Sequence, residues 1–243
     1  MYPKPTKLVT NKQFLNFCAA LFFCTSSVSF AQTNTDFETW SSINLEIKLH
    51  KKLNLELEEQ LRLKENSSET DQYFTQMGLS FQLPKDFEIG GGLRYAKKND
   101  NTGPKQGYES FFRYHIDLAF KHKRKRFDFK HRLRFQNKNE IGVSEAEGDN
   151  AKKNLRFKSS VSYNVRNWKL DPKFSAEIFN RSQQGKEGGF HKYRLTLGSQ
   201  YKFQNLGQID LFFRLEQSLN AVLTKSTKII GFSYTYALDK KNN

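Results

Sequence analysis

Apolar and polar residues alternate along most of the chain. The pattern is clearest in residues 52–65, where leucine fills five of six successive alternate positions and charged or amide side chains stand between them. At about 100° per residue a helix would scatter these leucines around its circumference, whereas a strand places them on one face. Helix propensity is worth only tenths of a kcal/mol per residue, and burial of a leucine is worth about 2 kcal/mol. The period therefore predicts a strand.

The same alternation recurs in other segments and predicts eleven strands. They are residues 43–49, 53–63, 73–83, 87–95, 112–120, 127–135, 155–165, 169–179, 193–201, 209–217 and 230–238. At about 3.3 Å per residue and a tilt near 45°, a strand of about eleven residues spans roughly 25 Å, the height of the apolar band of an outer-membrane barrel. Strands of soluble proteins more often have about five or six residues.

The number of strands depends on the start of the chain. A short extra strand in residues 34–42, around Trp40, would make the count even, as is usual for bacterial barrels. We therefore expect an all-β fold, an antiparallel transmembrane β-barrel of about 12 strands with a range of about 10 to 12. Pro172 predicts a bulge or a frayed strand within residues 169–179.

The connections between the expected strands alternate in length, which is typical of short periplasmic turns and longer external loops. The longer ones are residues 65–71, 97–107, 137–153, 180–190 and 218–226. Aromatic residues stand near strand ends, as in interfacial girdles; they include Tyr73, Phe87, Tyr95, Tyr108, Phe120, Phe127, Tyr201 and Tyr236. A soluble sandwich or lipocalin-like barrel would also alternate, with its apolar face inside. Strand length, loop asymmetry and girdles favour the membrane barrel.

The first thirty-one residues have the layout of a secretory signal peptide. A basic start is followed by the apolar run "FLNFCAALFFCTSSVSF" and by "SFAQ", which predicts cleavage between Ala31 and Gln32. A transmembrane anchor is the alternative, but the run is short for one. Cleavage would remove Lys4, Lys7 and Lys12 and no acidic residue, so the formal net charge would fall from +15 to +12.

The mature chain, residues 32–243, is then expected to form one barrel. Both cysteines, Cys18 and Cys24, lie in the segment expected to be removed. The mature protein would have no disulfide, no thiol nucleophile and no cysteine-based metal site. Hydrogen bonds and burial alone would stabilise it.

Three segments carry a resemblance to a known family. They are "TW" at 39–40, "LNLELEEQLRL" at 53–63 and "GFSYTYAL" at 231–238. In these the chain is similar to an uncharacterised family of outer-membrane barrels from Gram-negative bacteria, catalogued as domain of unknown function 2490. The resemblance implies a barrel fold, the bacterial outer membrane as location, the barrel-assembly machinery as a partner during biogenesis, and no established activity. The last strand departs from the usual assembly signal, because Leu238 stands where an aromatic residue is common.

If leucine and phenylalanine face lipid, the opposite face of each strand lines the lumen, and this face is net basic. Its basic residues are Lys48, Arg62, Lys64, Arg94, Arg113, Lys130, Arg132, Arg134, Arg156, Lys158, Lys169, Lys173, Lys192, Arg194, Lys202 and Arg214. Its acidic residues are Glu46, Glu56, Glu58, Glu88, Glu109, Asp117, Asp128, Asp171, Glu177, Asp210 and Glu216. Similar heights on neighbouring strands suggest that Glu56 and Glu58 meet Lys48, and that Arg132 meets Asp117.

Two physical outcomes follow from such a lumen. A surplus of positive charge favours passive passage of small, preferably anionic solutes, and Lys130, Arg132 and Arg134 would form an anion-facing ladder. Alternatively, paired charges fill a narrow barrel and make it a non-conducting structural or partner-binding protein. A lipid-modifying outer-membrane enzyme is a third possibility.

The sequence offers little catalytic chemistry. No serine, histidine and acid stand in a recognisable hydrolase pattern, and there is no phosphate loop or metal-ligand cluster, so we expect no enzyme and no cofactor. His131 is unusual because strand parity places it on the lipid face. The basic turn "KHKRKR" at 121–126 is expected to contact the anionic headgroups of outer-membrane lipid rather than nucleic acid.

Overall fold

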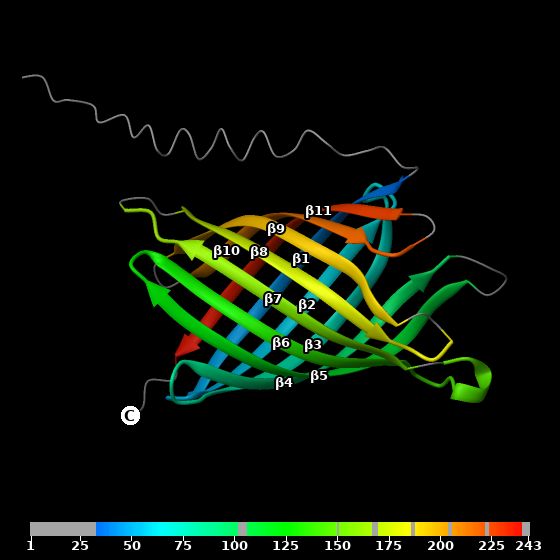
Figure 1. Cartoon of the computed structure of the whole chain (residues 1–243), viewed down its shortest axis with the longest axis horizontal. Coiled ribbons are helices and arrows are strands. Elements are labelled where there is room, and N and C mark those ends of the chain that lie inside the picture. Colours follow the sequence, from blue (N-terminus) through cyan, green and yellow to red (C-terminus); the bar gives the residue numbers. More distant parts are fainter. Residues whose placement is uncertain are drawn as a thin grey trace, which may run out of the picture. The chain divides into compact units, whose positions relative to one another are not determined.

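The chain folds into a single closed β-barrel (Figure 1). The computed structural model describes residues 33–101, 106–149, 151–166, 170–185, 188–203, 206–221 and 224–239. Its elements are β1 (Thr33–His50), β2 (Leu53–Lys64), β3 (Glu69–Gln82), β4 (Phe87–Asp100), β5 (Gly107–Arg124), β6 (Phe127–Glu140), the 3-10 helix η1 (Glu145–Glu147), β7 (Lys152–Tyr163), β8 (Leu170–Ser182), β9 (Gly189–Phe203), β10 (Gly207–Ser218) and β11 (Thr224–Asp239). The signal-peptide cleavage predicted after Ala31 lies outside the described residues.

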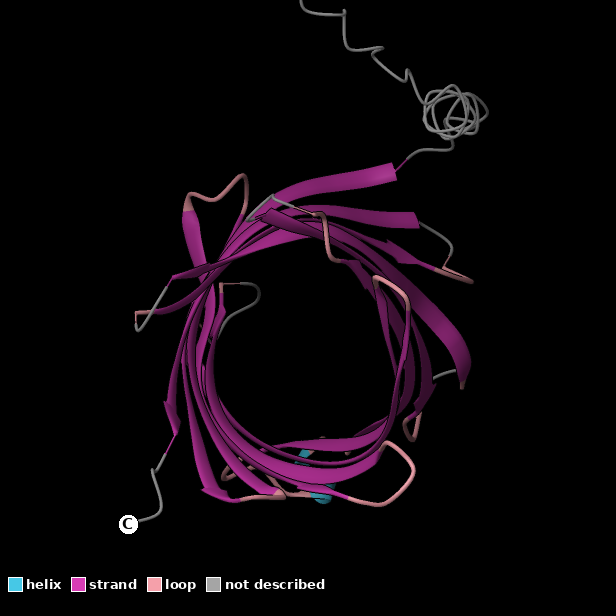
Figure 2. Cartoon of the chain, turned by 90° about the vertical axis from the view of Figure 1, so that its left-hand side faces the viewer, coloured by secondary structure: helices cyan, strands magenta, loops and turns pink. Residues whose placement is uncertain are grey.

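Each strand pairs antiparallel with its neighbours in sequence, and β1 lies beside β11 to close the ring. Figure 2 shows this ring of strands from one end of the barrel. Because eleven is odd, an up-and-down chain brings β1 and β11 together in the same direction. The side chains at this seam are small and polar. Ser42 Oγ of β1 donates to Ser233 Oγ of β11 at 2.9 Å, and Asn44 Nδ2 donates to the same oxygen at 2.7 Å.

The expected count of about twelve strands is wrong: the described residues form eleven. Residues 34–42 do not make a separate strand, because β1 runs through them without a break over 18 residues. No glycine or proline interrupts this stretch, and its inward alternation continues from Trp40 to Ser42 and Asn44. Pro172 lies just beyond the β7–β8 ladder, which ends at the pair Ser162–Lys173, while its pairing to β9 continues.

The apolar face of the strands is the outer face of the barrel. Large apolar side chains at alternate positions are exposed there; they include Met77, Leu79, Leu93, Phe112, Ile116, Leu118, Leu133, Leu155, Phe157, Leu197, Leu211, Phe213, Ile230 and Phe232. A soluble lipocalin-like barrel would place these side chains inside. Among the described residues, no helix has the length and apolar composition needed to cross a membrane.

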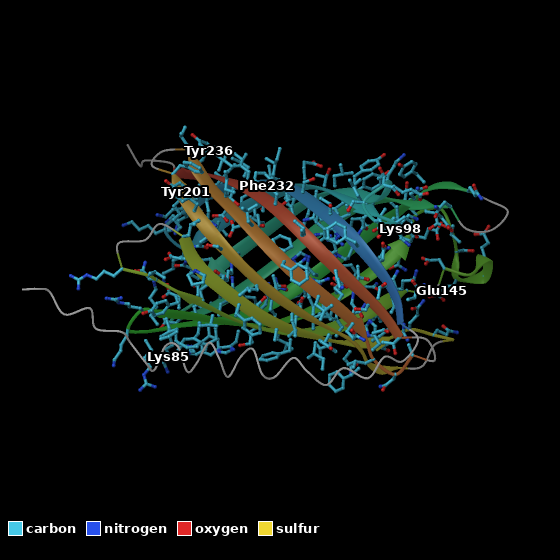
Figure 3. The ribbon with its side chains drawn as sticks, turned by 90° about the horizontal axis from the view of Figure 1, so that it is seen from above. Lys85, Lys98, Glu145, Tyr201, Phe232 and Tyr236 are labelled. Carbon is cyan, nitrogen blue, oxygen red and sulfur yellow. The ribbon has the colours of Figure 1, made fainter. Side chains whose placement is uncertain are left out.

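The two ends of the barrel differ in their connections. One end, which we call the turn end, carries the connections 51–52, 83–86, 125–126, 164–169 and 204–206. The opposite end, which we call the loop end, carries the connections 65–68, 101–106, 141–151, 183–188 and 219–223. In Figure 3, Lys85 lies at the turn end, while Lys98 and Glu145 lie toward the loop end. Tyr201 and Tyr236 lie toward the turn end, near the ends of their strands.

Candidate functional site in the lumen

Four aromatic side chains in the loop-end half of the barrel point inward. We call Trp40, Phe74, Phe111 and Phe179 the aromatic layer; each lies nearer to the loop end of its strand, and none is more than 5% exposed. Phe74 and Phe111 pack together with Ala96. Since these rings face the lumen, their burial means that neighbouring inward side chains cover them.

The sequence analysis missed the aromatic layer, although a signal for it exists. Strict alternation allows one apolar residue in every two, so two apolar residues in succession mean that one of them points inward. Such doublets occur at Tyr73–Phe74, Phe111–Phe112 and Ile178–Phe179. In each doublet the inward member belongs to the aromatic layer, and the other is exposed or half-buried.

Cations stack on the rings of the aromatic layer. The guanidinium carbon of Arg62 lies 3.6 Å from the centre of the Trp40 ring, and that of Arg94 lies 3.2 Å from the Phe74 ring. Lys138 Nζ lies 3.4 Å from the Phe111 ring. A cation over an aromatic face is stabilised by about 0.5–2 kcal/mol, with the larger values where water is excluded. Cations can therefore be held in this half without a carboxylate for each.

Glu177 of β8 is the centre of the ion pairs in the same half. Its carboxylate accepts from Arg156 at 2.8 Å and from Arg132 and Arg194 at 3.2 Å each, and its side chain is 2% exposed. Arg194 also contacts Glu216, which pairs with Lys192 at 2.7 Å. Three guanidinium groups around one buried carboxylate are stable only as a set, because each would otherwise be a buried charge without compensation.

A second network lies on β2 to β5. Arg94 and Arg113 both donate to Gln76 Oε1 at 2.8 Å, and Arg94 also pairs with Glu58 at 3.4 Å. Gln76 Nε2 donates to Glu58 at 3.1 Å. This network lies near the middle of the barrel, on the turn-end side of Phe74 and Phe111.

Two of the expected ion pairs are wrong, and strand register is the reason. Asp117 stands opposite Arg134 on β6 and pairs with it through two hydrogen bonds of 2.6 Å, while Arg132 stands opposite Ala119 and reaches Glu177 instead. The register of β5 and β6 thus determines that Asp117 pairs with Arg134 and not with Arg132, two residues away.

The expected contact of Glu56 and Glu58 with Lys48 is also absent from the described contacts. Lys48 stands opposite Asn54, Glu56 stands opposite Glu46, and Glu58 pairs with Arg94. Two carboxylates therefore face each other across the β1–β2 pair.

A cavity of about 420 Å³ occupies the turn-end half, and we call it the turn-side cavity. Its wall comes from β1 to β6, where Gly78 and Gly90 place no side chain at inward positions. His115 packs over Gly92, so that a Cβ there would lie 2.6 Å from the imidazole Cε1. The charged residues of the wall are Glu46, Glu56, Glu58, Glu88, Asp117, Arg94, Lys121, Lys130, Arg132 and Arg134. The cavity is thus polar and contains as many acids as bases.

The other predicted lumen residues occupy different environments. Arg214 stacks on Trp40 and on Phe212, with its guanidinium carbon 4.8 and 4.4 Å from the ring centres. Lys158 is half-buried on β7. Asp128 lies at the turn end, where it pairs with the exposed Lys123 at 3.1 Å. Lys169 lies outside the described residues.

The histidines show no catalytic arrangement in the described part of the chain. His131 lies in an aromatic stack, with its ring centre 5.6 Å from that of His122 and 6.4 Å from that of Phe157. His122 also stacks on Phe129 at 4.7 Å. It lies in β5, which continues to Arg124, so the segment predicted as a basic turn at 121–126 forms a turn only at 125–126. Among the described residues, no three histidine, cysteine or acidic side chains are grouped as metal ligands would be. That the chain is not an enzyme stays a prediction.

Comparison with known proteins gives a family and no closer relative. The model of a family described as "Protein of unknown function (DUF2490)" matches residues 37–221, which is most of the chain. No curated protein and no solved structure matches. The match covers β1 to β10, so the aromatic layer and the turn-side cavity both lie within the matched region.

Proposed function

Since the chain belongs to DUF2490, a family of unknown function, we propose its role from the geometry of the lumen: a barrel of the Gram-negative outer membrane that does not conduct solutes in its resting state. The observation that carries this proposal is the burial of the aromatic layer. In a water-filled pore, inward side chains at every level would be exposed to solvent. Here the four rings are at most 5% exposed.

The outer face supports a membrane location. Its alternate positions present a band of exposed leucine, isoleucine and phenylalanine around the barrel. Contiguous apolar surface of this extent is unusual for a soluble monomer, and a barrel satisfies all backbone hydrogen bonds in lipid because it has no free edge. The predicted signal peptide would direct the chain to the Sec pathway, and the barrel-assembly machinery would insert it.

The charge networks support a lumen that stays closed. Opening a path through the loop-end half would separate Glu177 from its three arginine partners. Removal of one partner from a buried ion pair costs about 3–5 kcal/mol. Thermal fluctuation alone would therefore open the path rarely.

A second candidate is passage of small anions, and the surplus of cations favours it. Arg62, Arg113, Lys158 and Arg214 have no carboxylate within ion-pair distance among the described residues. Unpaired cations within low-dielectric walls attract anions. In this case the Lys130, Arg132 and Arg134 side chains would contact the solute on the turn-side cavity.

Planar-bilayer recording under a salt gradient separates the two candidates. The refolded protein, shown to be folded by its altered mobility on heating, is expected to give no discrete current steps. Steps with an anion-selective reversal potential that moves when Arg132→Glu is introduced would support passage and overturn the closed lumen. Lys85→Glu, at the turn end, is the control for a general change of charge.

The membrane location has its own test. Cells that express the full chain are expected to yield a processed protein in the outer-membrane fraction of a density gradient. A processed protein in the soluble periplasmic fraction would overturn the location and leave the bilayer result without a physiological meaning.

A further inference from the structure

We propose that the turn-side cavity binds a small zwitterion, with the ammonium group of the ligand between Glu46 and Glu56 and its acidic group at Lys121 and Lys130. Both poles belong to the wall of one cavity of about 420 Å³. Cavities that hold small ligands in proteins have volumes of about 300–1,000 Å³ and a few convergent polar groups.

The negative pole is a pair of exposed carboxylates without a bonded partner. Glu46 and Glu56 are direct cross-strand partners, and both line the cavity. Side chains so placed have Cβ atoms about 4.5–5.5 Å apart, and like charges there repel each other. Among the described residues neither carboxylate forms a hydrogen bond or an ion pair, although other carboxylates of the same wall do. An ammonium group between them would satisfy both.

His115 is an independent sign of a ligand in the same cavity. It lines the cavity, is 5% exposed, and its buried Nδ1 has no hydrogen-bond partner within the described residues. Buried polar groups without a partner are uncommon and call for an explanation such as a bound molecule. A neutral imidazole offers one acceptor and one donor, so it can bond to either a ligand N–H or a ligand oxygen.

The positive pole is a pair of lysines that share one acid. Lys121 Nζ donates to Glu88 Oε2 at 2.6 Å, and Lys130 Nζ donates to Glu88 Oε1 at 3.1 Å. Two ammonium groups on one carboxylate leave an excess positive charge, and each ammonium has further donors because it carries three hydrogens. The two lysine side chains are 44% and 43% exposed, so these donors can reach a ligand.

The remaining charges of the wall are already matched. Arg94 pairs with Glu58, Arg134 with Asp117, and Arg132 with Glu177. The uncompensated charge is therefore negative at β1 and β2 and positive at β4 to β6. A ligand with one charge would satisfy one pole and leave the other, whereas a zwitterion satisfies both.

Calorimetric titration of the purified protein in detergent tests this directly. The probes are glycine, γ-aminobutyrate and ε-aminocaproate, which differ in the distance between their charges, and the singly charged n-hexylamine and caproate. At least one zwitterion is expected to bind at least tenfold more tightly than either singly charged compound. Equal affinities for all five probes, or no heat from any of them with the folded protein, would overturn the proposal.

Single substitutions assign the poles. Glu56→Gln should weaken zwitterion and n-hexylamine binding about tenfold or more and leave caproate binding unchanged, while Lys130→Gln should weaken zwitterion and caproate binding and spare n-hexylamine. Glu65→Gln and Lys85→Gln make the same chemical changes in the turns at 65–68 and 83–86 and should alter nothing. Loss of zwitterion binding in the control variants alone would contradict the assignment.

The inference does not rest on the closed lumen. Titration in detergent needs no membrane potential and reports on the cavity whether or not the barrel conducts. If no probe binds and the bilayer recording shows no current steps, the zwitterion site is contradicted and the closed lumen is supported. If a zwitterion binds and the recording shows anion-selective steps, the site is supported and the closed lumen is contradicted.

Discussion

The two halves of the lumen are built on the same strands but are filled differently. On β3, the inward position near the loop end is Phe74, while the inward position near the turn end is Gly78. On β4, Ala96 stands opposite Phe74 and belongs to its cluster, whereas Gly90 lies nearer to the turn end and lines the turn-side cavity. The backbone alternation is the same in both halves, so the identity of the inward residue alone decides whether the lumen is filled.

Charge follows the same division. In the loop-end half, the Glu177 carboxylate is shared among three arginines, and the cationic groups of Arg62 and Lys138 lie on aromatic rings. In the turn-side cavity, Glu46 and Glu56 face each other without a described partner. A half with buried rings and shared ion pairs is a stabilising structure, whereas a hollow half with unpaired carboxylates is suited to binding. The comparison therefore predicts that equivalent substitutions have opposite effects in the two halves.

The largest effect is expected from Glu177→Gln. The substitution leaves three arginines around a neutral amide, and loss of one member of a buried ion network costs about 3–5 kcal/mol. Equilibrium unfolding in urea, in lipid vesicles and followed by tryptophan fluorescence, should show this loss. A loss below about 1 kcal/mol would mean that water reaches Glu177 and that the loop-end half is open.

Two glycine substitutions come next. A Cβ at Gly231 would overlap the ring of Phe212, whereas a Cβ at Gly78 would meet only Gly91 O at 3.6 Å. Gly231→Ala is expected to destabilise by about 1–3 kcal/mol through overpacking. Gly78→Ala should be neutral or should stabilise by about 0.5–1 kcal/mol because alanine loses less backbone entropy. Unfolding of both variants in urea measures the change in the free energy of unfolding for each. An equal loss of stability in the two variants would contradict the prediction.

A smaller effect of opposite sign is expected in the cavity. Glu56→Gln removes a like charge opposite Glu46 and should stabilise the empty protein by up to about 1 kcal/mol. Glu58→Gln, two residues away, weakens its bonds to Arg94 and Gln76 and should destabilise by about 1.5–3 kcal/mol. The same unfolding assay measures both. If Glu56→Gln also destabilises, the carboxylate has a partner and the negative pole is not free.

The smallest effect is expected at the turn end. Asp128 pairs with Lys123 at 3.1 Å, but their side chains are 48% and 82% exposed. Exposed pairs are worth about 0–1 kcal/mol and are screened by salt. Asp128→Asn should change the urea midpoint little at low salt and not at all at high salt. A loss as large as that of Glu177→Gln would remove the distinction between buried and exposed pairs.

Much of the fold follows from the alternation of apolar and polar residues alone. When one face of a strand is buried or faces lipid, the alternation determines which side chains lie on that face and which lie on the other. The leucines of residues 53–63 predict β2 in this manner, and the same alternation identifies its inward residues. The strand count was wrong since nothing in the alternation marks where β1 begins. Strand length depends on pairing with β2 and β11 as well as on local pattern.

The contacts of the lumen were harder to predict. Parity assigns Arg132 and Arg134 to the same face but not to partners, because partners depend on register, and register comes from turn geometry and the whole sheet. The aromatic layer was missed because phenylalanine was assumed to face lipid, although the doublet Phe111–Phe112 requires one ring on each side. The turn-side cavity lies where Gly78 of β3 and Gly90 of β4 carry no side chain, and only the strand pairing brings these two residues together.

Thiol labelling tests the difference between the two halves most directly. Cys18 and Cys24 are the only cysteines of the chain, so with both replaced by serine a single new cysteine reports on one position. Ala96→Cys, inward and 4% exposed in the loop-end half, is compared with Ser80→Cys, which lines the turn-side cavity. A water-soluble maleimide should label the cysteine at position 80 at least tenfold faster in the folded protein, and both positions equally in urea. Equal rates in the folded protein would show that water fills both halves and would contradict the closed lumen.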